Sequence, residues 1–106
     1  MINYQDFQKI DLRVGKIISA EKIEGSEKLI KLKVDLQKET RQIVAGIGKF
    51  YQLEELINKL IIVVCNLEPK EIFGHRSEGM LLAASDEENV VLITPEKEIS
   101  LGAQVR

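Results

Sequence analysis

The sequence predicts a small all-β protein. Apolar and polar residues alternate along several short segments, most clearly from Ile30 to Leu36, where two lysines lie on the outer side. Such alternation is typical of a strand that buries one face. A second observation is the continuous apolar run Leu60–Cys65, which is long enough for a buried strand. Only one stretch, Lys49–Lys59, changes to the three- and four-residue spacing of a short amphipathic helix.

The first half of the chain is predicted to hold one short helix and three strands. Asn3 can cap a helix over residues 3–9, although a helix so short needs a surface to pack on. A strand begins at Ile10, and its apolar parity changes after Gly15, which indicates a bulge or a sharp bend in one long strand. Residues 30–36 and 41–45 follow as strands joined by a connection of hairpin length.

The second half of the chain supplies the remaining strands. The run at residues 60–65 is followed by predicted strands at residues 80–84 and 90–93. This order, with a bent first strand, is typical of a five-stranded OB-fold barrel that has a short helix between strands 3 and 4. A two-sheet sandwich is the alternative, but the chain has few strands for two sheets. The 106 residues fit one domain, so we expect a single domain over residues 1–106.

Composition limits the possible classes of function. The net charge of -2 argues against a strongly basic nucleic-acid binder. Residues 86–98 hold five acids and one lysine, however, so the other 93 residues carry +2 and could form a modest basic face. The chain has no apolar run of membrane-spanning length and no signal-peptide pattern, so we expect a cytoplasmic protein without a membrane partner.

The sequence contains few candidates for catalysis, and we expect no enzyme activity. Cys65 and His75 are the only cysteine and histidine, which excludes an internal disulfide and a zinc site of the usual Cys/His type. A Cys–His nucleophile pair stays open on spacing alone, although free cysteine at the end of an apolar run is usually buried. The Gly46–Gly48 segment lacks the rest of a phosphate-binding fingerprint. We predict no catalytic residues, no metal ligands and no cofactor.

The stretch from Cys65 to Ser85 is the strongest candidate for a binding site. Pro69 argues against a central strand there, and a polar, bent loop between strands often carries binding function. Phe73 and Met80 offer apolar contacts for a base or ribose. The alternative for Phe73 is a core plug under the loop, and core packing at the mouth of a strand is favoured for Met80. In an OB barrel, the second and third strands and the adjoining loops form the ligand surface. The basic residues expected in that region are Lys28, Lys31, Lys33, Arg41, Lys70 and Arg76.

Five spaced blocks of residues give the chain a resemblance to a known family. The blocks are Asp11–Ile17, Glu24–Leu29, Val44–Ile47, Cys65–Lys70 and Ser77–Met80, the last followed by residues 82–84. In this order they resemble the tRNA-binding OB domain that is appended to methionyl-tRNA synthetases. The same domain occurs as a free-standing structure-specific tRNA-binding protein, and a start at a Met close to the beginning of the domain resembles that form. A domain cut from a synthetase would begin similarly.

The resemblance implies a homodimer that binds the outer corner of tRNA without reading the anticodon. Residues 3–9 and 99–106 would form the dimer contacts. The implied tRNA contacts fall on Asn66, Lys70, Ser77 and Met80, and His75 and Arg76 would compensate for the acids at Glu68 and Glu71.

The sequence thus predicts a non-catalytic tRNA-binding module that assists a methionyl-tRNA synthetase. A related homodimeric export chaperone that binds peptides shares the implied fold and is the alternative. A salt-sensitive interaction would favour tRNA over an apolar peptide.

Overall fold

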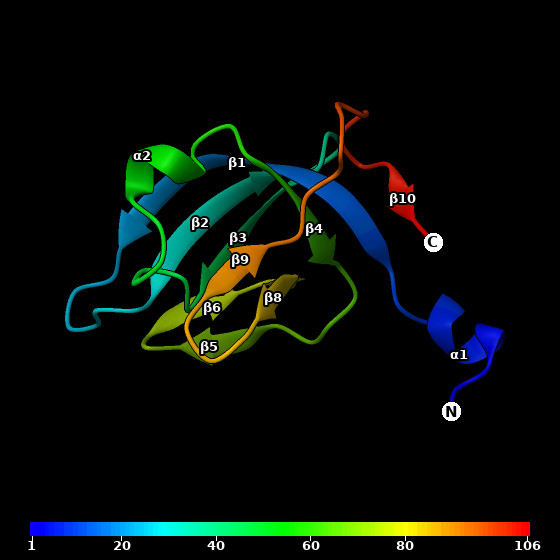
Figure 1. The fold of residues 1–106 in the computed structure, drawn as a ribbon, viewed down its shortest axis with the longest axis horizontal. Coiled ribbons are helices and arrows are strands. Elements are labelled where there is room, and N and C mark those ends of the chain that lie inside the picture. Colours follow the sequence, from blue (N-terminus) through cyan, green and yellow to red (C-terminus); the bar gives the residue numbers. More distant parts are fainter.

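An antiparallel sheet curls into a nearly closed barrel in the computed structural model, which describes residues 1–106 (Figure 1). Its strands are β1 (Leu12–Lys22), β2 (Ile30–Asp35), β3 (Thr40–Ala45), β4 (Leu60–Val64) and β7 (Met80–Leu81), in the spatial order β3-β2-β1-β4-β7. The gap between β7 and β3 is bridged by the residues just before β7, since the Glu78 N–H donates to the Gln42 carbonyl at 2.8 Å. The predicted OB-like, all-β fold is confirmed.

Strand β1 is long enough to pair with two different neighbours. Its first part, Leu12–Lys16, pairs with β4, and its second part, from Lys16 onward, pairs with β2. The predicted irregularity in one long strand is confirmed, but the register shift lies between Ile17 and Ser19 rather than at Gly15. Gly15 instead allows β1 to pack closely on β2, because a Cβ at position 15 would lie only 2.5 Å from a methyl group of Val34.

The apolar parity of β1 changes because its first part buries the outer face of the strand and its second part buries the inner face. Leu12 and Val14 belong to an outer apolar cluster with Ile62 and Val64 of β4, whereas Ile17 points into the barrel. Side chains of the terminal segments cover the outer cluster, namely Phe7, Leu101, Ala103 and Val105. Residues 60–65 form a continuous apolar run because this segment is buried on both faces. Alternate side chains enter the inner and the outer cluster.

Two short helices accompany the barrel. Helix α1 (Tyr4–Gln8) begins as predicted, with the Asn3 side chain accepting a hydrogen bond from the Asp6 N–H at 2.9 Å. Helix α2 (Leu53–Leu56) lies between β3 and β4 as predicted but is much shorter than the expected Lys49–Lys59. It ends early because Ile57 is extended and Asn58 has a positive φ of 70°. Neither helix is long and apolar enough to cross a membrane.

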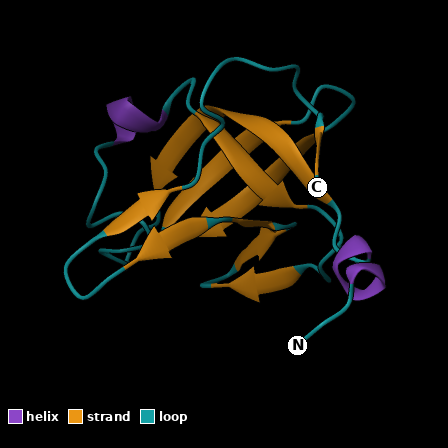
Figure 2. Ribbon diagram, turned by 45° about the vertical axis from the view of Figure 1, so that its right-hand side comes forward, coloured by secondary structure: helices purple, strands orange, loops and turns teal.

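The second half of the chain contains more strands than we predicted. The loop after β4 holds a hairpin, β5 (Lys70–Ile72) and β6 (His75–Ser77), and Pro69 stands just before its first strand. The expected strand at residues 80–84 is divided at Leu82 into β7 and β8 (Ala83–Ser85), and β8 pairs with β9 (Val90–Leu92). Finally, β10 (Gln104–Val105) pairs with the start of β1, so that the chain is dominated by strands (Figure 2).

Candidate nucleic-acid interface

The predicted binding loop is largely the β5–β6 hairpin, which is fastened to the free edge of β3. The Val44 N–H donates to the Ser77 hydroxyl at 3.0 Å, and that hydroxyl donates to the Gly79 carbonyl at 3.2 Å. The Gln42 side-chain amide donates to the Arg76 carbonyl at 2.8 Å. Because β3 is paired with β2 on its other edge, the outward side of β2 and the hairpin form one continuous surface. We call this surface the binding face.

Two lysines of β2 lie on the outward side of the strand. Lys33 is exposed and stands opposite Gln42, which also bonds to the hairpin. Lys31 stands opposite Val44, and its amine lies 3.8 Å from a carboxylate oxygen of Glu21. The two lysines therefore belong to the binding face as predicted, but only Lys33 is free of an acidic partner among the ion pairs of this structure.

The hairpin divides its own basic residues between two sides. Lys70 is paired with Ser77, and Glu71 is paired with Arg76. Paired residues share a face and neighbouring residues alternate, so Lys70 and Arg76 lie on opposite sides of the hairpin. The Arg76 guanidinium also lies 3.9 Å from a carboxylate oxygen of Glu78. The two cations therefore point away from different faces of the hairpin.

An apolar groove of about 410 Å³ lies beneath the hairpin, between β3 and the β7–β8 segment. Its apolar lining includes Val44, Ile47, Leu67, Ile72, Met80 and Ala83, and Glu68 and Lys70 are its charged residues. Met80 is 48% exposed and is therefore not a core residue. The groove gives the binding face an apolar part that is open to solvent.

Phe73 lies at the tip of the hairpin, beside the loop that joins β1 to β2. The residue is 59% exposed, so the alternative in which it packs under the loop is wrong. The ring lies close to Gly25, because a Cβ on that glycine would be 3.2 Å from the Phe73 Cε2 atom. Lys28 is exposed in the same β1–β2 loop, and its carbonyl accepts a hydrogen bond from the Gly48 N–H.

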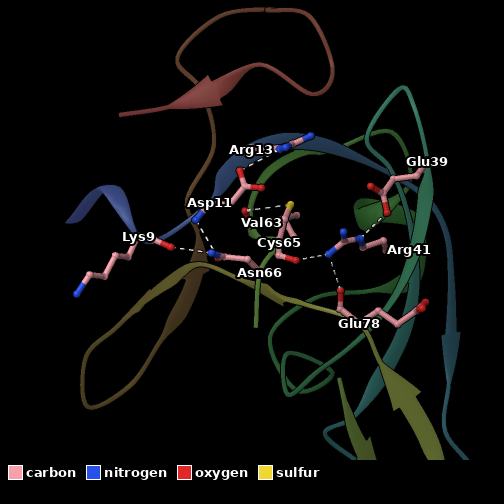
Figure 3. A network of polar contacts seen from close by, with 9 residues as sticks. All are labelled: Lys9, Asp11, Arg13, Glu39, Arg41, Val63, Cys65, Asn66 and Glu78. Carbon is pink, nitrogen blue, oxygen red and sulfur yellow. Dashed lines mark hydrogen bonds and ion pairs between the residues drawn. The ribbon is translucent and has the colours of Figure 1, made fainter. Parts of the chain in front are cut away.

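Arg41 does not lie on the binding face. It is paired with Val34, a core residue, and its guanidinium turns into one end of the barrel (Figure 3). One of its terminal nitrogens donates to the Cys65 and Glu78 carbonyls, and its Nε atom donates to Glu39 at 2.6 Å. Hydrogen bonding to Glu39 raises the pKa of Arg41, and the bond from Arg41 lowers the pKa of Glu39. The expectation that Arg41 shares a surface with the β2 lysines is therefore wrong.

The sequence contained a signal for the inward position of Arg41. Arg41, Ile43 and Ala45 share one parity in β3, and the latter two are buried. Alternation therefore places the three side chains on one side of the strand. The prediction grouped Arg41 with the lysines by charge alone and did not consider on which side of the strand its side chain lies.

Asn66 and Ser77 use their polar side-chain atoms within the protein. The Asn66 amide oxygen accepts from the Asp11 N–H at 2.8 Å, and its nitrogen donates to the Lys9 carbonyl at 2.6 Å (Figure 3). Ser77 is 4% exposed and bridges β3 to Gly79. Both residues hold the loop in place, and no local pattern could have revealed partners so distant in sequence.

No catalytic centre is built from the only cysteine and the only histidine. Cys65 is buried in the core, and its thiol donates to the Val63 carbonyl. Burial raises the pKa of the Cys65 thiol, which opposes formation of a nucleophilic thiolate. His75 is half-buried in the hairpin, opposite Ile72. No group of three or more His, Cys, Asp or Glu side chains is arranged to hold a metal ion.

Comparisons with known proteins agree with this geometry. The family model described as "Putative tRNA binding domain" matches residues 12–104. A methionine–tRNA ligase from Pyrococcus horikoshii is 55% identical over 105 residues, which is 99% of this chain but only 14% of the ligase.

Two solved structures cover all of this chain. The crystal structure of a MetRS related protein from Pyrococcus horikoshii has a TM-score of 0.94 and 42% identity, and 98% of that chain is covered. The crystal structure of the chaperone CsaA from Bacillus anthracis has a TM-score of 0.91 and 34% identity, and 99% of that chain is covered. The family match extends over nearly the whole barrel, and this chain belongs to the family of tRNA-binding domains that methionine–tRNA ligases also contain.

Proposed function

We propose that this chain is a non-catalytic tRNA-binding module that binds the outer corner of tRNA by shape and assists a methionyl-tRNA synthetase in the cytoplasm. The observation that carries the proposal is the hairpin fastened to β3, which brings the loop beside the strand that carries Lys31 and Lys33. The family to which the chain belongs supports tRNA as the ligand. Its contact residues are Lys28, Lys31, Lys33, Lys70, His75, Arg76 and Met80.

Phosphate contacts supply the attraction in this proposal. Each lysine or arginine that meets a phosphate releases counterions, so the affinity falls with added salt. Contacts with phosphates and sugars fix position without reading bases, and recognition by shape suits a module that serves many RNA sequences. Three candidate residues act indirectly, because Arg41, Asn66 and Ser77 hold the barrel end and the loop in place.

The module assembles as a homodimer through its terminal segments. Helix α1 has no buried residue and projects from the barrel, and a five-residue helix is not stable without a packing surface (Figure 1). Several large apolar side chains near the two termini are exposed, among them Ile2, Tyr4, Ile10 and Ile99. A second copy related by a two-fold axis would cover these side chains.

Two copies would raise the tRNA concentration near an associated synthetase. Once one copy has bound a tRNA, binding by the second copy or by the synthetase becomes intramolecular. Several weak tRNA contacts then act together at a high effective concentration. This explains how a domain with a net charge of -2 can still retain tRNA.

The test measures binding to bulk tRNA as a function of salt for the wild type, Lys70→Ala and Arg76→Ala. Each variant should weaken binding and reduce the slope of log affinity against log salt by about one, because one phosphate contact is lost. The thermal midpoint should hardly change, since both side chains are exposed. Lys97→Ala, at an exposed lysine of the acidic segment, is the control and should leave the affinity unchanged.

Nuclease footprinting then locates the site on the RNA. Protection of the outer corner at low salt would support the proposal. Absence of any protection at low salt would end it.

A peptide-binding chaperone is the second candidate function. It is favoured by the open apolar groove beneath the hairpin and by the similarity to structures named as the chaperone CsaA. An apolar peptide would stay bound as salt rises, because burial of apolar groups does not depend on counterion release. Loss of ligand between low and moderate salt therefore distinguishes tRNA binding from peptide binding.

A further inference from the structure

We propose that the ring of Phe73 is a platform on which an unpaired base of the bound RNA stacks. The proposal rests on the proposed function. It adds an aromatic stacking contact to the phosphate contacts made by lysine and arginine. Three features of the hairpin tip carry it, namely its backbone conformation, the surroundings of the ring and the charge of the hairpin.

The backbone at the tip is unfavourable for a phenylalanine. Ile72 is paired with His75, so Phe73 and Gly74 form a two-residue connection, and their φ angles are 54° and 82°. Positive φ at both positions is the mark of a type I′ turn, in which Asn, Asp and Gly are strongly preferred. A bulky residue in this conformation is a genuine outlier, and such outliers gather at ligand-binding sites. The hairpin alone therefore gives no reason for an aromatic residue at position 73.

The ring lies against a neighbouring loop, and the residue is still largely exposed to solvent. It lies beside Gly25 of the β1–β2 loop, where φ is 87° and any side chain would press on the ring. Yet Phe73 remains 59% exposed. The ring thus stands between the two loops that flank the ligand surface of an OB barrel. Because the residue is exposed, a planar group can reach it without displacing a core residue.

The charge of the hairpin indicates that phosphate contacts do not act alone. Residues 68–79 contain three acids, Glu68, Glu71 and Glu78, against the two permanent cations Lys70 and Arg76. A surface with this balance attracts the RNA backbone only weakly. Stacking on an aromatic ring does not depend on net charge, and every base has a face that can stack. His75 and Arg76 directly follow the turn and are placed to contact the sugar-phosphate groups beside a stacked base.

A competing explanation is that Phe73 only braces the two loops against each other, and Phe73→Asn separates the two. This variant creates Asn-Gly, the favoured pair for the observed turn. If the ring binds a base, the thermal midpoint should stay within a few degrees or rise, while tRNA affinity falls about five- to a hundredfold. Binding to a fully paired RNA duplex should not change. A large fall in the midpoint, or an unchanged tRNA affinity, would overturn the inference.

A fluorescent variant reports the contact directly. The chain has no tryptophan, so Phe73→Trp introduces a single one at the hairpin tip. Stacking of a base should quench its emission when tRNA is added. Ile57→Trp is the matched control, because Ile57 is 38% exposed at the end of helix α2, outside the hairpin and the proposed dimer contacts, and should keep its emission. Equal quenching at the two sites, or none at position 73, would contradict stacking.

The same titrations distinguish failure of this inference from failure of the proposed function. If the wild type binds no tRNA at low salt, the proposed function and the stacking inference are both refuted. If the wild type binds, Lys70→Ala weakens binding and Phe73→Asn does not, only the stacking contact is excluded.

Discussion

At the scale of single residues, the side of the strand decides which basic side chains can reach a ligand. Lys33 and Arg41 lie on neighbouring strands, but Lys33 points to solvent and Arg41 points into the barrel end. The Arg41 guanidinium donates hydrogen bonds to the backbone carbonyls of Cys65 and Glu78 there. A buried acceptor without a partner costs about 1–3 kcal/mol. Arg41 is therefore a structural residue, whereas Lys33 is free to meet a phosphate.

Replacing Arg41 by alanine should lower the free energy of unfolding by about 1–3 kcal/mol, because two carbonyls lose their donor. Urea denaturation measures the change. Lys33→Ala is the control on the adjacent strand and should alter stability by at most about 0.5 kcal/mol. The folded Arg41→Ala protein should still bind tRNA. A variant that is fully stable but has lost tRNA binding would show that Arg41 contacts the RNA after all.

Glu39 should make the stability of the protein depend on acid pH. The hydrogen bond from Arg41 lowers the pKa of Glu39 below its ordinary value of 4.5. The stabilisation that the Glu39–Arg41 hydrogen bond supplies is therefore complete above pH 4.5. It is lost as the pH falls through the lowered pKa of Glu39 in the folded state. Glu39→Gln should be less stable than the wild type near neutral pH, and the difference should disappear in acid. Unfolding midpoints across the pH range test this, and a difference that grows in acid would contradict it.

At the scale of elements, one side chain joins the first helix to the binding loop. Asn66 begins the segment that leads to the hairpin, and its amide bonds to the backbone on both sides of Ile10, at Lys9 and Asp11. Helix α1 has no buried residue of its own. Its position relative to the barrel therefore depends on these two hydrogen bonds and on the packing of Phe7 against the outer cluster.

Asn66→Asp should release helix α1 while leaving the barrel intact. The aspartate can still accept from the Asp11 N–H, but it has no donor for the Lys9 carbonyl. Hydrogen exchange at residues 3–10 should accelerate, and exchange in β1 to β4 should not. Asn89→Ala, at an exposed turn, serves as the control. Unchanged exchange at residues 3–10 would show that other contacts hold the helix.

At the scale of the whole molecule, the barrel has an apolar cluster on its outside as well as a core inside. The terminal segments cover the outer cluster only in part, and apolar side chains around it remain exposed. Burying such surface stabilises by about 25 cal/mol for each Å². A dimer through this side would leave β2 and the hairpin of each copy free for RNA, because the outer cluster lies on β1 and β4.

Two isoleucines of similar exposure test the dimer. Ile10 is 41% exposed beside the terminal segments, and Ile18 is 43% exposed at the bulge of β1. Ile10→Glu should shift the sedimentation coefficient from dimer to monomer, because a charge would be buried in the interface. Ile18→Glu should leave it unchanged. A monomeric wild type, or equal effects of the two variants, would rule out the proposed interface.

Much of the fold could be predicted because its signals are local. Alternation located β2 and β3, the continuous apolar run located β4, and Asn3 marked the start of α1. The prediction was less successful where local signals were overridden. Helix α2 is cut short at Ile57, and the hairpin within residues 65–85 was missed because the first position of its turn is Phe73 rather than the expected Asn, Asp or Gly.

The sequence by itself determined the main strands of the barrel, the start of the first helix and which family the chain resembles. All of these depend on the order and spacing of neighbouring residues. Only the tertiary structure decided that Arg41 closes the barrel end, that Asn66 and Ser77 fasten the loop and that Lys70 and Arg76 face opposite ways. Those roles depend on partners tens of residues away, and strand pairing alone brings such partners together.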